Sequence, residues 1–176
     1  MKYVCHKHDK GLLGRTPKEV ALVEMIAGPV GELKGGTTMP CYTTGDMAAI
    51  KGVIASKLPG IKAFLGSKKF LAGDDVTYID FVFFELLHFN NFITDGEILQ
   101  DSTLSAYEAR VRALNGIQAF FESDFTKALA FNNKMAKIGN KAGHVAEQSD
   151  IKVHYFDFGG LGDAVRMTLH AAKVKF

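Results

Sequence analysis

The amino-acid sequence predicts a mainly helical fold that ends in a single strand–helix unit. Apolar residues recur at helical spacing from Asp46 to Leu65 and fill almost every position from Tyr78 to Leu87. From Ile151 to Phe156 the pattern changes to the alternation of a strand, and helical spacing returns from Asp163 to Lys173. We therefore expect three parts: a helical domain over 1–141, a linker over 142–150 and a strand–helix unit over 151–176.

Composition bounds the class of protein. The chain has 176 residues, of which 47% are hydrophobic, so it can bury a core. Its formal net charge of +2 is too small to predict a nucleic-acid partner. The apolar runs are too short or too often interrupted for a membrane span, and the N-terminus lacks a signal-peptide pattern. Cys5 and Cys41 are expected to be free thiols, so the sequence predicts a cytoplasmic protein.

The first helical segment is short. Lys2 to His8 resembles the last turns of a helix whose beginning is absent, with Gly11 and Gly14 as the turn residues that close it. His6 and His8 are two residues apart, which on a helix directs their side chains to different faces. No metal site is predicted there.

A longer helix is predicted to begin at Thr16. Thr16 and Glu19 have the spacing of a capping box, and a proline occupies the first helical position. We expect Gly28–Gly31 to kink or end this helix, because the proline there removes a hydrogen bond and the glycines weaken the turn. Lys34 to Thr38 is then expected to be a flexible turn, without the sequence context of a phosphate-binding loop.

Three more helical segments follow the same reasoning. The segment from Asp46 to Leu65 contains an internal proline that is expected to bend it. The segment from Leu104 to Leu114 is amphipathic, with Arg110 and Arg112 expected to point outward. A short apolar helix is expected at Ile117–Phe121.

The helix that starts after Thr77 carries the most specific local signal. Thr77 is a candidate N-cap whose hydroxyl can accept from the backbone N–H of Asp80, while the Asp80 carboxylate reaches back to the N–H of Thr77. The following residues are apolar on nearly every face, so this helix is expected to lie in the middle of the domain. These residues alone predict a well-capped core helix, which many unrelated proteins contain.

The wider sequence around that capping box resembles the C-terminal domain of cytosolic glutathione transferases, and the mu class most closely. The resemblance includes the segment Phe70–Phe81 and extends to Tyr3–His8, Cys41–Tyr42, Phe64–Gly66 and Lys134–Lys141. It covers about four fifths of the chain. The resemblance implies the helical domain of that family and glutathione as co-substrate.

The segment Tyr155–Arg166 resembles the first strand and first helix of the thioredoxin-like domain of the same transferases, with sigma-like features. In the family this piece comes first, whereas here it comes last, so the order resembles a circular permutation. The middle of the thioredoxin-like domain has no counterpart. A lone strand and helix leave open sheet edges, so we expect a homo-oligomer or a complementing chain to complete the sheet.

The resemblance also implies roles for individual residues. Tyr155 would donate a hydrogen bond to the glutathione sulfur and favour the nucleophilic thiolate. Tyr42 and Phe158 would line the pocket for an apolar electrophile, and three residues would contact glutathione: Leu161, Arg166 and Glu32. For Tyr155, Tyr42 and Glu32 the alternatives are an ordinary strand tyrosine, a half-buried helix aromatic and a solvated carboxylate.

Three functions are compatible with these observations. The first is conjugation of glutathione to electrophilic small molecules, completed by another chain or copy. The second is a non-catalytic module derived from the transferases, retained as a docking surface in a larger assembly. The third is a carrier of apolar ligands in the helical cleft, for which the phenylalanine-rich composition is equally explained by a core.

Overall fold

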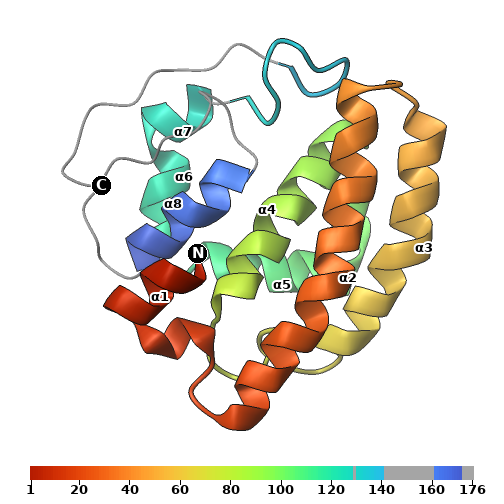
Figure 1. The fold of residues 1–176 in the computed structure, drawn as a ribbon. Coiled ribbons are helices and arrows are strands. Elements are labelled where there is room, and N and C mark those ends of the chain that lie inside the picture. The colour runs from red at the N-terminus through yellow and green to blue at the C-terminus, as the bar shows by residue number, and fades with distance from the viewer. Residues whose placement is uncertain (129, 141–160, 172–176) are drawn as a thin grey trace.

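The computed structural model describes residues 1–128, 130–140 and 161–171, and these residues form a helical domain (Figure 1). The helices are α1 (Lys2–His8), η1 (Lys10–Leu13), α2 (Pro17–Tyr42), α3 (Met47–Leu65), α4 (Tyr78–Ile93), η2 (Ile98–Gln100), α5 (Ser102–Arg112), α6 (Ile117–Glu122), α7 (Asp124–Ala128) and α8 (Leu161–Ala171). The described part contains no strand, so the predicted mainly helical class is confirmed. The predicted strand at 151–156 and the linker at 142–150 lie outside the described residues.

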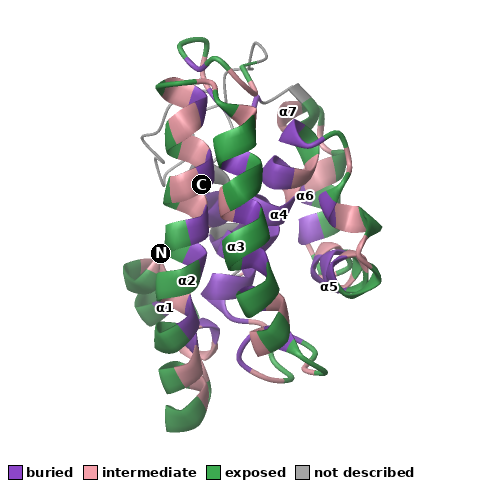
Figure 2. Ribbon diagram, turned by 90° about the vertical axis from the view of Figure 1, so that its right-hand side faces the viewer, coloured by how far each residue is buried: buried purple, intermediate pink, exposed green. Residues whose placement is uncertain are grey.

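Helix α4 is the centre of the domain. Every residue from Tyr78 to Leu87 is buried, and α4 contacts α2, α5 and α8 (Figure 1). Figure 2 shows α4 buried along most of its length, whereas α2 and α3 each have an exposed outer face. The prediction that this helix lies in the middle of the domain is confirmed.

The Asp80 carboxylate organises the start of α4. Its Oδ2 accepts the backbone N–H and the hydroxyl of Thr77, both at 2.8 Å. Its Oδ1 accepts the N–H of Leu71 and the hydroxyl of Tyr107, also both at 2.8 Å. Thr77 and Asp80 form the predicted capping box, and Asp80 also ties the preceding loop and α5 to α4. Burial, and then the charge of Asp80, raise the pKa of Tyr107, which therefore remains a donor.

Helices α2 and α3 form a hairpin beside α4 (Figure 1). The capping box at Thr16 is confirmed: the Glu19 N–H donates to the Thr16 hydroxyl at 3.2 Å, and the Glu19 carboxylate accepts the Thr16 N–H. The N-cap of α3 is Asp46, which accepts the N–H of Ala49 at 3.0 Å. Helix α3 continues through its internal proline to Leu65.

Helix α2 does not end at Gly28–Gly31, and the predicted turn at Lys34–Thr38 is wrong. Helix α2 runs without a break to Tyr42. One face of the helix is buried throughout, at Val23, Ile26, Val30, Leu33, Thr37 and Cys41. Burial of this stripe outweighs the poor local propensity. At Gly36 the glycine allows close packing, because a Cβ there would lie 2.7 Å from Cγ1 of Val53 in α3.

The C-terminal helix α8 packs on the helical domain. It contacts α4, α6 and α1, and its Ala164 and Met167 belong to the common core. The Thr168 hydroxyl donates to the Ala164 carbonyl at 2.7 Å and also approaches Sδ of Met1 at 3.6 Å. Within the described residues, no helix is long and apolar enough to cross a membrane. Cys5 and Cys41 are buried free thiols, as predicted.

Candidate functional site

One face of α2 gathers three partly buried polar residues. Lys34, Thr38 and Tyr42 are spaced by four residues, so they lie one above the other on the same side of the helix. This face adjoins α4, because Lys34 bonds to a residue of α4. Tyr42 is a predicted site residue, and Lys34 and Thr38 are polar residues on the same face of α2. We call this face the stripe Lys34–Thr38–Tyr42.

Lys34 forms a nearly buried ion pair with Glu85. Lys34 Nζ lies 2.7 Å from Glu85 Oε2, and the side chains are 13% and 4% exposed. A carboxylate inside an apolar helix would be costly without this partner. The pair therefore joins α2 to α4 by charge, and each group neutralises the other.

Tyr42 ends α2 at the other end of the stripe, about 12 Å of helix rise from Lys34. Its hydroxyl oxygen accepts the backbone N–H of Asn133 at 3.3 Å. Because the oxygen acts as acceptor in that bond, the hydroxyl proton of Tyr42 can still donate to another group. Tyr42 is half-buried, which agrees with the alternative of a structural helix aromatic, and its role in an electrophile pocket remains a prediction.

The other predicted site residues are dispersed. Glu32 is exposed on α2, about 15 Å of helix rise from Tyr42, and pairs with Lys57 of α3 at 2.6 Å. Arg166 is buried on α8, with its guanidinium 5.6 Å from the ring centre of Phe125 in α7. Leu161 is the first residue of α8.

Tyr155 and Phe158 lie outside the described residues, so the predicted thiolate site stays a prediction. The described residues contain no group of three or more side chains suited to hold a metal ion.

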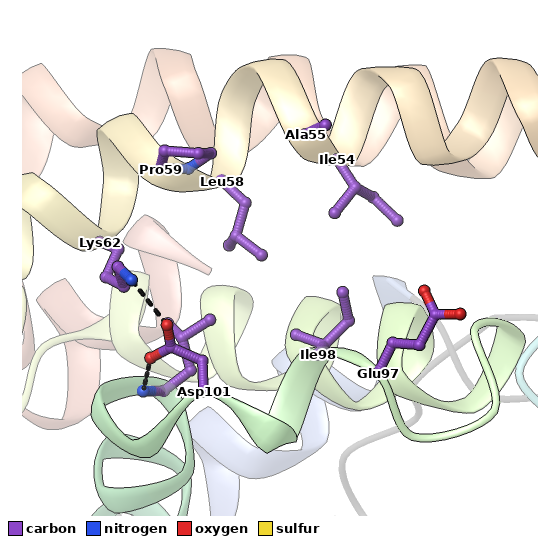
Figure 3. A pocket seen from close by; sticks show the side chains of 9 residues that line it. Ile54, Ala55, Leu58, Pro59, Lys62, Glu97, Ile98 and Asp101 are labelled. Carbon is purple, nitrogen blue, oxygen red and sulfur yellow. Dashed lines mark hydrogen bonds and ion pairs between the residues drawn. The ribbon is translucent and has the colours of Figure 1, made fainter.

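A pocket of about 210 Å³ lies between α3 and the segment η2–α5, and none of the residues that line it is a predicted site residue (Figure 3). Ile54 and Leu58 of α3 face Ile98 of η2 across it. Lys62 and Asp101 form an ion pair of 2.6 Å at one end. Hydrogen bonding from Lys62 lowers the pKa of Asp101, which keeps the carboxylate charged and engaged. The pocket is therefore apolar and holds no uncommitted reactive group.

The sequence analysis missed the Lys34–Glu85 pair. Glu85 is a single carboxylate within an otherwise apolar stretch of α4, which is a signal for a buried partner. The eight-residue spacing of Lys34 and Tyr42 would place both on one face of a helix, but the glycines around Lys34 predict a turn instead. Their contact joins residues 51 positions apart, so the local pattern does not specify it.

The prediction that Arg112 points outward is also wrong. Its Nε donates to Oε1 of Glu108 at 2.8 Å, and its guanidinium lies 4.9 Å from the ring centre of Phe121. His88 Nε2 lies 2.7 Å from the same Glu108 oxygen. Burial raises the pKa of Glu108, but hydrogen bonds from His88 and Arg112 outweigh burial and lower it overall. Arg112 therefore joins α5 to α4 and α6.

Known proteins with similar sequences are glutathione S-transferases. Residues 42–124 match the family described as "Glutathione S-transferase, C-terminal domain". The chain is 32% identical to human glutathione S-transferase Mu 3 over 146 residues, which cover 80% of this chain and 63% of that protein. It is 30% identical over 145 residues to glutathione S-transferase Mu 3 of Macaca fuscata fuscata, with the same coverage of 80% and 63%.

A solved structure agrees at the level of the fold. The crystal structure of the glutathione S-transferase Blo t 8 superposes with a TM-score of 0.69 and 19% identity, covering 78% of this chain and 68% of that chain. The described helices thus have the fold of a glutathione S-transferase C-terminal domain. The chain spans a little under two thirds of the length of the mu-class relatives that it matches.

Proposed function

We propose that this protein conjugates the glutathione thiolate to electrophilic small molecules. The observation that carries the proposal is the Tyr42 hydroxyl at one end of the stripe Lys34–Thr38–Tyr42, whose oxygen accepts the Asn133 N–H and whose proton can still donate. The similarity to mu-class transferases supplies the reaction class. In this proposal the stripe is the electrophile-binding side of the site, and Phe158 adds an apolar wall.

The chemistry that we propose is a nucleophilic attack by sulfur on carbon. The Tyr155 hydroxyl donates a hydrogen bond to the glutathione sulfur, which lowers the pKa of the thiol and favours the thiolate. The thiolate forms a C–S bond to the electrophile, and the displaced group leaves with its bonding electrons. Tyr42 donates a hydrogen bond to the negative charge that develops on the electrophile. Leu161, Arg166 and Glu32 are the proposed glutathione contacts.

The strand–helix unit at 151–176 requires completion in this proposal. We place it as the first strand and helix of a thioredoxin-like domain in permuted order, with the remaining strands supplied by another chain or by a second copy. The packing of α8 against α4 supports a role for this helix next to the helical domain. A homo-oligomer is one way to supply the missing edge.

The second candidate is a non-catalytic module derived from the transferases. It is favoured by the commitment of Glu32, a proposed glutathione contact, to an ion pair with Lys57 of α3. In that case Tyr155 has no thiol to bind. The helical domain would then serve only as a docking surface.

A conjugation assay with glutathione and a general aromatic electrophile separates the two candidates. The assay is run on the purified chain alone and again with its native partners. Loss of one donor to a charged reacting group typically costs about 100-fold in rate, so Tyr155→Phe, which removes the donor to the thiolate, should lower kcat/KM by about that factor. Tyr42→Phe removes the donor to the charge that develops on the electrophile and should lower it by up to about 100-fold.

The matched control is Tyr3→Phe. This substitution removes the same hydroxyl oxygen from a tyrosine of α1 that is 74% exposed. Its rate should equal that of the unchanged protein. Absence of conjugation in both settings would favour the non-catalytic module. Activity that is insensitive to Tyr155→Phe would remove Tyr155 from the proposed site.

A further inference from the structure

The segment 131–139 crosses the end of α2 and is fastened there at several points. The backbone N–H of Lys137 donates to the Cys41 carbonyl at 2.7 Å, next to Tyr42 in the chain. The ring of Phe131 lies 5.8 Å from that of Phe89 and 5.2 Å from that of Phe92 in α4. The segment is therefore fixed to both α2 and α4 on either side of Asn132 and Asn133.

Asn132 is the most strongly held residue of this segment. It is 3% exposed, and its backbone N–H donates to the Gly139 carbonyl at 3.0 Å. Its side-chain Nδ2 donates to the Ile138 carbonyl at 2.9 Å. These bonds fix both the backbone and the side chain of Asn132.

We propose that Asn132 is a positioning residue for Tyr42. The peptide group that presents the Asn133 N–H begins at the carbonyl carbon of Asn132, so the orientation of Asn132 sets the direction of that N–H. The N–H meets the Tyr42 oxygen at 3.3 Å and thereby holds the hydroxyl in one place. Asn132 thus acts on the hydroxyl through the backbone of its neighbour, without touching a substrate. Only the catalytic consequence of this contact rests on the proposed function.

The test of the contact itself needs no activity. Hydrogen exchange of the residue 133 amide is followed by NMR in the folded protein. Asn132→Ala should speed this exchange about fivefold, the factor expected for loss of one ordinary hydrogen bond, and Tyr42→Phe should do the same. Asn133→Ala is the matched control, because it keeps the backbone N–H and removes only the side-chain bond to the Met135 N–H.

A second variant disturbs the same contact from the other side. Gly139 has φ +75°, and a Cβ there would lie 3.1 Å from Nδ2 of Asn132. Gly139→Ala should therefore also speed exchange at residue 133. If Asn132→Ala and Gly139→Ala both leave that exchange unchanged in folded protein, the proposal is overturned. If Asn132→Ala does not fold, the result with Gly139→Ala decides.

The conjugation assay then measures the catalytic consequence. Asn132→Ala should lower kcat for the electrophile in the same direction as Tyr42→Phe, and leave the KM for glutathione unchanged. The double variant should be no slower than Tyr42→Phe alone, because both changes act on one hydroxyl. Additive losses would overturn the positioning role. An inactive unchanged protein would overturn the proposed function, while the exchange result still decides whether Asn132 holds the Tyr42 contact.

Discussion

Helices α2 and α4 pack against each other, but they become helical for different reasons. Helix α4 starts with a capping box and contains neither glycine nor proline. Helix α2 contains four glycines and two internal prolines. Relative to alanine, a glycine in a helix interior costs about 1 kcal/mol and a proline about 3 kcal/mol. Local sequence is sufficient to specify α4, whereas α2 depends on its contacts with α3 and α4. Substitutions in the two helices should therefore behave differently.

The largest effect is expected at the start of α4, for Asp80→Asn. Each carboxylate oxygen accepts one backbone N–H, from Leu71 on one side and Thr77 on the other. In either orientation of an asparagine side chain, its NH₂ group would face one of these N–H donors and could not accept the hydrogen bond. We expect the free energy of unfolding in urea to fall by about 3 kcal/mol, as for other broken buried networks.

The control for this prediction is Asp46→Asn at the exposed N-cap of α3, where asparagine is an equally good cap. It should change the free energy of unfolding very little. Equal losses for the two variants would mean that the Asp80 network adds nothing beyond capping.

The next largest effect is expected at the α2–α3 contact, for Gly36→Ala. The added Cβ would lie 2.7 Å from Cγ1 of Val53, so the helices must separate, and we expect a loss of about 2 kcal/mol in urea unfolding. Gly35→Ala is the matched comparison one residue away, where a Cβ meets nothing within 4 Å. It should stabilise by about 0.5 to 1 kcal/mol through helix propensity. Stabilisation by both changes would show that α2 does not need close packing with α3.

This difference explains what could be predicted from the sequence. The capping boxes at Thr16 and Thr77 join residues three positions apart, so a short window of sequence contains all the information. The continuity of α2 depends on a stripe that is buried by other helices, and the glycines and prolines within it locally predict the opposite. Helix α2 was therefore misassigned where tertiary packing overrides propensity.

The candidate site divides in the same way. The role of Tyr42 comes from resemblance and remains a prediction. The Lys34–Glu85 pair was missed because it joins residues 51 positions apart. The pair of Arg112 with Glu108 has the i,i+4 spacing of one helix and could have been predicted, whereas the approach of Arg112 to His88 joins residues 24 positions apart.

A smaller effect of opposite sign is expected for Pro29→Ala in the exposed part of α2. Alanine restores a backbone N–H and improves helix propensity, which favours the folded state. The unfolded chain also gains conformational freedom, which offsets part of that gain. We expect a net stabilisation of about 1 kcal/mol in urea unfolding. A loss of stability instead would show that the packing of α2 requires the geometry that proline imposes.

The smallest effect is expected for Glu108→Gln, which tests the contacts of α4 on the side away from α2. The pKa of Glu108 is lowered in the folded protein, so the charged form stabilises the fold above the ordinary pKa of about 4.3. This contribution should be lost as the pH falls through the lower, folded value. At pH 7 the substitution should cost up to about 1 kcal/mol, and the difference from the unchanged protein should shrink toward pH 3.

Urea midpoints at both pH values measure this change, and Glu122→Gln at the exposed end of α6 is the control. That variant should track the unchanged protein at both pH values. A difference for Glu108→Gln that persists at pH 3 would mean that shape rather than charge joins α5 to His88. In that case the two sides of α4 would differ, because the Lys34–Glu85 pair joins α2 to α4 by charge.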